Sequence, residues 1–117
     1  MYEQECEDTG MIYAVSALLI TNKGFELKQR LEDGSIAALR PDGREIVASM
    51  KRAKLGGDGV VRWTETCFCG APLKHERETV LDSYFTDIET NEISEHSPVD
   101  GSPFLSYLDE VAAKHQP

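Results

Sequence analysis

Three glycine-containing turns follow one another at nearly even spacing in the first half of the chain. They occupy residues 22–24, 32–34 and 41–43, and each suits a type I turn followed by Gly in the left-handed region. Between the first two turns, an extended segment would place Phe25, Leu27 and Leu31 on one face. Residues 12–20 precede the first turn and can pair with this segment. The pattern predicts an antiparallel meander of short strands.

The segment after the third turn fits two structures. Residues 45–51 continue the hairpin pattern and are interpreted as the next strand. The same region also fits a helix over 43–55, in which Asp42 and Glu45 resemble a capping box and Gly56 ends the helix. We favour the strand because the preceding turn is typical of a hairpin.

The central part of the chain predicts a second hairpin. Residues 60–69 are rich in Val, Trp, Thr and Phe, which favours a strand, and a Gly-Ala-Pro sequence at 70–72 ends it. Residues 79–88 fit either a helix face or a strand covered on both faces. We favour the strand, because residues 89–92 resemble a turn that would lead into a further strand.

Two of the three Cys lie at the tip of this predicted hairpin. The favoured interpretation packs Cys67 and Cys69 beside Trp63 as small apolar side chains. The rival interpretation makes Cys67, Cys69 and His75 zinc ligands, although a structural zinc pair usually has two or more intervening residues. A fourth zinc ligand could come from one of three residues: Cys6, His96 or His115. Dithiol redox chemistry, or a Cys69 nucleophile with His75 as its base, completes the alternatives.

Two short charged clusters are assigned no chemistry. Lys51, Arg52 and Lys54 form the one compact basic cluster and are interpreted as a solvated end of an element. Glu76 and Glu78 flank Arg77 and are interpreted as surface ion-pair partners, because acid–base catalysis would need burial to shift a pKa.

The C-terminal part predicts a helix. Residues 92–101 are polar and contain Pro and Gly, which indicates a loop or a short edge strand. Ser102 is predicted to cap a helix that begins at Pro103. One apolar stripe is expected to pack this helix on the sheet: Phe104, Leu105, Leu108, Val111 and Ala112.

Charge is unevenly distributed along the chain, whose net charge is −9. Residues 23–62 hold nine Lys and Arg against six Asp and Glu, whereas residues 63–117 hold three against eleven. No Lys or Arg lies between Glu78 and Glu110. A solvated acidic face is one interpretation, and a surface for a basic partner is the other. Direct nucleic-acid binding is disfavoured, because phosphate contacts need clustered cations.

Length and composition predict a single domain of 117 residues with an acidic, flexible segment at 1–10. The longest apolar run, residues 11–20, is about half of what crosses a bilayer. An acidic beginning is unlike a secretion signal, so a cytoplasmic location with reduced thiols is expected. The predicted fold class is α+β and mainly antiparallel β: a meander sheet or small barrel with a C-terminal helix packed on it.

We therefore expect a non-catalytic protein-binding module with an acidic surface. One concrete form is an inhibitor that competes with nucleic acid for a basic partner. The expected partner-binding residues are all carboxylates: Glu78, Asp82, Asp87, Glu89, Glu92 and Glu95. The alternative is a small zinc-binding domain that uses Cys67, Cys69 and His75. Neither membrane association nor an organic cofactor is expected.

Overall fold

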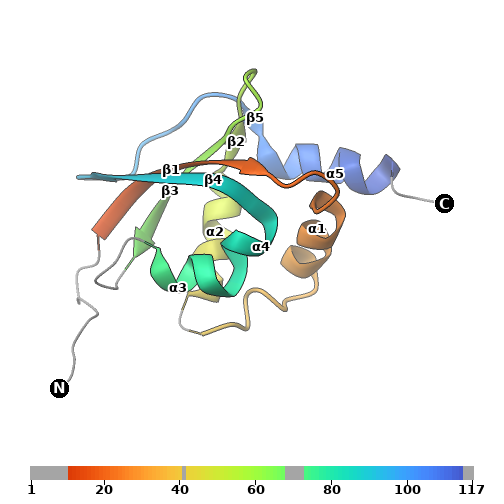
Figure 1. The fold of residues 1–117 in the computed structure, drawn as a ribbon, viewed down its shortest axis with the longest axis horizontal. Helices are drawn as coiled ribbons and strands as arrows, with labels where there is room; N and C mark the ends of the chain where they lie inside the picture. The colour runs from red at the N-terminus through yellow and green to blue at the C-terminus, as the bar shows by residue number, and fades with distance from the viewer. Residues whose placement is uncertain (1–10, 41, 68–72, 115–117) are drawn as a thin grey trace.

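The computed structural model describes residues 11–40, 42–67 and 73–114, apart from the side chain of His75. Within them an open, five-stranded antiparallel sheet has the strand order β4-β1-β3-β2-β5. In Figure 1 most helices lie below the sheet, and the C-terminal helix extends from its right-hand end. The strands are β1 (Met11–Leu19), β2 (Lys54–Leu55), β3 (Val61–Cys67), β4 (Phe85–Ile93) and β5 (Ser102–Pro103). The helices are α1 (Gly24–Glu32), α2 (Gly43–Arg52), α3 (Lys74–Glu76), η1 (Arg77–Leu81), α4 (Asp82–Tyr84) and α5 (Phe104–Lys114).

The predicted α+β class with an antiparallel sheet and a C-terminal helix is confirmed, and the sheet does not close into a barrel. The predicted N-terminal segment 1–10 lies outside the described residues. None of the described helices is long and apolar enough to span a bilayer.

The predicted meander in the first half is wrong, because helices α1 and α2 follow β1 where strands were expected. Leu27 and Leu31 lie four residues apart, so they share a helix face as well as a strand face. In α1, Leu27 is fully buried. In α2 the buried side chains of Ile46, Ser49 and Met50 follow helical spacing. The helix alternative for this segment was therefore the right one.

Strand β1 pairs with two strands that are distant in sequence. It runs antiparallel to β3, from Met11↔Cys67 to Ala17↔Val61, and antiparallel to β4, from Ile12↔Ile93 to Leu19↔Phe85. The hairpin predicted between 60–69 and 79–88 is therefore wrong. The turn predicted at 89–92 is also wrong, because those residues lie inside β4.

Residues 79–88 combine both predicted structures. Residues up to Tyr84 are helical, in η1 and α4, and β4 begins at Phe85. Val80, Leu81 and Tyr84 are fully buried on the helical part, so their burial requires a helix face rather than alternation along a strand. The strand interpretation is right from Phe85 onwards.

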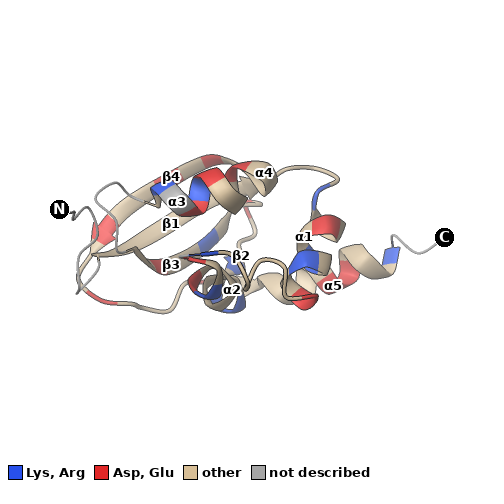
Figure 2. Cartoon of the chain, turned by 90° about the horizontal axis from the view of Figure 1, so that it is seen from below, with Lys and Arg blue, Asp and Glu red and all other residues tan. Residues whose placement is uncertain are grey.

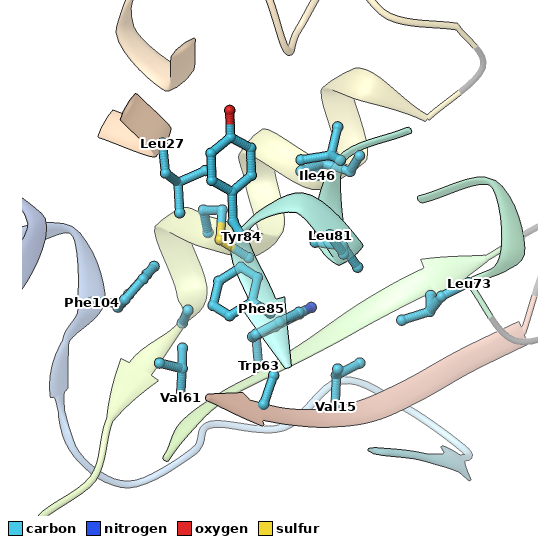
Figure 3. Packing of buried hydrophobic residues seen from close by; sticks show 14 of the residues in the cluster. Val15, Leu27, Ile46, Val61, Trp63, Leu73, Leu81, Tyr84, Phe85 and Phe104 are labelled. Atoms are coloured by element: carbon cyan, nitrogen blue, oxygen red, sulfur yellow. The ribbon is translucent and has the colours of Figure 1, made fainter. Parts of the chain in front are cut away.

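The hydrophobic core lies between the sheet and the helices, and Trp63 on β3 is near its centre (Figure 3). The Trp63 and Phe85 rings have centroids 5.3 Å apart, and Phe85 lies 6.0 Å from Phe104. Each of these fully packed side chains stabilises the fold by about 1.5–3 kcal/mol through removal from water. Trp63 thereby ties β3 to β4 and, through Phe85, to α5.

Helix α5 begins one residue later than predicted. Ser102 and Pro103 are extended and pair with Leu55 and Lys54 of β2, instead of capping the helix. Phe104 and Leu108 of the predicted stripe are buried, and the other three members are partly buried. The helix packs beside α1, where Lys28 Nζ lies 2.9 Å from Asp109 Oδ1.

Candidate functional site

Strand β4 forms one outer edge of the sheet. One side of the strand pairs with β1, and no described strand pairs with the other side. An unpaired edge presents main-chain N–H and C=O groups that can pair with an added strand. Asp87 has a φ of 54° where the register of β1 and β4 shifts, between Ser16 and Leu18. Such a bulge increases the local twist of the edge.

The six expected partner-binding carboxylates lie on this edge and on the helical segment that leads into it. Glu78 is on η1, Asp82 is on α4, and Asp87, Glu89 and Glu92 are on β4. Glu95 follows β4 in a bend, and all six residues are exposed. Figure 2 shows acidic segments of β4 and of the adjoining helical region on the same long side of the molecule.

Cations neutralise little of this charge. Asp82 accepts from Arg77, with Nε 3.1 Å from Oδ1, in an exposed pair that is worth little in water. The other five carboxylates make no ion pair with a described residue. The acidic residues from Glu78 to Glu110 do not all lie on one surface, because Asp109 is on α5 and pairs with Lys28 of α1. We call the exposed set on η1, α4, β4 and Glu95 the acidic edge.

The open edge of β3 contrasts with that of β4. Strand β2 pairs only with Val61 and Arg62, so the rest of β3 extends beyond it. Side chains of α2 bond to main-chain groups there: Arg52 Nη2 donates to Thr64 O at 2.8 Å, and Thr66 N donates to Glu45 Oε2 at 2.8 Å. These main-chain groups of β3 are therefore already satisfied within the chain.

Of the three candidate zinc ligands, Cys67 is the one whose side chain the structure describes. Cys67 is fully buried on the core face of β3, as the packing interpretation predicted. Cys69 and the side chain of His75 lie outside the described part of the structure. Among the residues that the structure describes, no group of three His, Cys, Asp or Glu side chains could hold a metal ion. Zinc binding by Cys67, Cys69 and His75 stays a prediction.

Two buried carboxyl groups were missed by the sequence reasoning. Glu65 and Glu76 are both fully buried, so the surface role predicted for Glu76 is wrong. Trp63 Nε1 donates to Glu65 Oε1 at 2.8 Å. Burial raises the pKa of Glu65 well above its ordinary value, the Trp63 hydrogen bond lowers it in part, and the neighbouring carboxyl of Glu76 raises it further. Glu65 therefore stays protonated to an unusually high pH in the folded chain.

A signal for Glu65 was present in the sequence. The alternation that places Val61, Trp63 and Cys67 on one face of β3 places Glu65 on the same face. Glu76 had no comparable signal, because its burial depends on where the short helix α3 packs.

Comparisons with protein-family models, curated proteins and solved structures found no match to this chain. Function therefore has to be inferred from the chain's own residues and their geometry.

Proposed function

We propose that this protein is a non-catalytic binding module whose acidic edge pairs with an extended, Lys- and Arg-rich segment of a partner protein. The observation that carries the proposal is the combination of an outer strand, unpaired among the described residues, with exposed carboxylates of which Asp82 alone has a described ion-pair partner. Strand addition would provide main-chain hydrogen bonds, and the carboxylates would select a basic segment.

The carboxylates also disfavour pairing of two copies of this protein. Two β4 edges brought together would place like charges opposite each other, which is destabilising. A basic segment meets no such repulsion and is attracted from a distance at low salt. Pairing of β4 with a cationic strand is therefore favoured over pairing with β4 of a second copy.

An inhibitor of a nucleic-acid-binding protein is one concrete form of this function. The carboxylates of the acidic edge have the same sign of charge as a phosphate backbone, so they would occupy a basic groove in place of nucleic acid. Binding of the partner and binding of nucleic acid to that partner would then be mutually exclusive.

The test uses a synthetic peptide in which Lys alternates with Val, and a control peptide with Glu in place of Lys. The edge triple variant, Glu89→Lys with Glu92→Lys and Glu95→Lys, should weaken binding of the Lys peptide at moderate salt by about tenfold or more. Asp87 is left unchanged, because Asp tolerates its left-handed backbone better than Lys.

A matched control triple keeps the change in net charge the same. It replaces Glu32, Asp100 and Glu110 by Lys, all exposed and outside the acidic edge. The proposal expects the control triple to bind within about twofold of wild type at moderate salt, where distant charges are screened. Equal losses in the two triples, or equal binding of the Lys and Glu peptides, would remove the proposal.

A further inference from the structure

A second charged feature, opposite in sign, lies where α2 ends beside β3. It is a cleft of about 380 Å³, within the range of small-molecule sites. Its lining includes Lys51, Arg52 and Lys54, and it contains no Asp or Glu. The net charge of the chain is −9, so three cations around one cleft make this region positive on a negatively charged protein.

Arg52 is held in place by contacts on one side of its guanidinium. Nη2 lies 2.8 Å from Thr64 O, 3.1 Å from Glu45 Oε2 and 3.3 Å from Ser49 Oγ. A guanidinium has five N–H donors, and no described residue accepts from Nε or Nη1 of Arg52. The group is therefore oriented by the fold and still has donors for a ligand.

The two lysines keep their charges available. Neither Lys51 nor Lys54 makes an ion pair with a described residue, whereas Lys28 and Arg62 each pair with a carboxylate. Both lysines line the cleft, and a long flexible stem lets an amine reach solvent or a ligand.

The rest of the lining comes mainly from the chain between β4 and β5. His96 bridges two hydroxyl groups of β3, with Nδ1 2.7 Å from Thr64 Oγ1 and Nε2 2.9 Å from Thr66 Oγ1. These bonds fix the position of the segment that adds Pro98 and Val99 to the lining. Pro98 and Val99 give the lining apolar surface beside the polar groups of His96 and Ser97.

We propose that this cleft binds a small organic molecule that carries a phosphate monoester. Lys51, Arg52 and Lys54 would hold the phosphate, whose two negative charges match several cations better than one carboxylate does. The cleft is larger than a bare phosphate needs, and Pro98 and Val99 give it a surface for the organic group. Three cations at one place cannot follow a nucleic-acid backbone, so a small ligand is favoured over a polymer.

The test titrates the full chain, labelled for NMR, with phenyl phosphate, inorganic phosphate, benzoate and a single-stranded oligonucleotide. Phenyl phosphate should bind most tightly and shift the amide signals of Lys51–Lys54 and of His96, Ser97 and Val99. The double variant Lys51→Gln, Lys54→Gln should weaken its binding about tenfold or more, since each charged hydrogen bond contributes roughly a factor of ten.

Two controls separate this site from the acidic edge and from net charge. A double variant of Lys23→Gln with Lys114→Gln, remote from the cleft, should bind phenyl phosphate within about twofold of wild type. The edge triple should also keep this binding, so failure here and failure of the protein-binding proposal are distinguishable. No binding of phenyl phosphate, an equal loss in the Lys23 and Lys114 control, or tighter binding of the oligonucleotide would overturn the proposal.

Discussion

Strands β3 and β4 both carry carboxylates, and the two strands use them in opposite ways. On β4 they are exposed and have no described ion-pair partner. On β3, Glu65 is buried beneath the sheet and accepts from Trp63. Glu45 of α2 also serves β3, because it accepts from the main chain at Thr66.

The main-chain edges of the two strands differ in the same way. Where β3 extends beyond β2, side chains of α2 bond to its N–H and C=O groups. The outer side of β4 has no such cover among the described residues. A fold that satisfies one exposed edge internally and leaves the other open makes the open one available for binding.

The largest effect is expected for Trp63→Phe on β3. The smaller ring leaves a void against Phe85, and Glu65 Oε1 loses its buried donor, so unfolding free energy should fall by about 2–4 kcal/mol. Urea denaturation measures it. Glu92→Ala on β4 is the control and should change stability by less than about 0.5 kcal/mol. Similar losses in the two variants would break the contrast between the strands.

A somewhat smaller effect is expected for Arg52→Ala. The variant leaves Thr64 O without its charged donor at the β3 edge, which should cost about 1–3 kcal/mol. Arg44→Ala is the matched control, because Arg44 is exposed on the same helix, and it should be neutral within about 0.5 kcal/mol. Equal stability of the two variants would show that the β3 edge does not depend on α2.

The dependence of stability on pH separates buried from exposed carboxyl groups. Because the pKa of Glu65 is raised on folding, the folded chain binds more protons than the unfolded chain. The stability that Glu65 contributes is fully present below its unfolded pKa of about 4.3, and it is lost as the pH rises through the pKa of the folded chain. The slope approaches about 1.4 kcal/mol per pH unit for one such group.

The check compares wild type with Glu65→Gln by thermal unfolding across pH. Gln keeps an acceptor for Trp63 and cannot ionise, so the variant should lose less stability than wild type as the pH rises. Parallel pH profiles for the two proteins would contradict the burial of an ionisable group at Glu65.

The smallest effect is expected for Glu89→Gln. Removing one exposed charge from the acidic edge should raise unfolding free energy by a few tenths of a kcal/mol at low salt, and by nothing measurable at high salt. The same variant should bind the Lys peptide more weakly. A loss of stability instead would show that Glu89 makes a contact that stabilises β4.

The sequence predicted the fold class better than the individual elements. Of the three turn glycines, only Gly34 has positive φ, at 85°. Gly43 begins α2 and is needed for a close approach, because a Cβ there would lie 2.1 Å from Ile36 O. Turn chemistry and close packing both require Gly, so the residue type alone could not distinguish a hairpin from the start of a helix.

The predictions were wrong for short segments whose apolar residues fit both the period of a strand and the period of a helix. Leu27 and Leu31 share a face in a strand and in a helix, and packing against α5 decides between them. The six expected partner-binding carboxylates are all exposed, and their role in binding stays a prediction, whereas Glu76, predicted at the surface, is buried. The basic cleft could not be predicted, because it joins the end of α2 to His96, distant in sequence.

Amide hydrogen exchange of β4, measured with and without the Lys–Val peptide, tests the open edge most directly. We predict that the outward-facing β4 amides exchange at least about tenfold more slowly when the peptide is bound, while Thr64 and Thr66 keep their rates. Unchanged exchange along β4 at saturating peptide, or protection confined to another element, would contradict it.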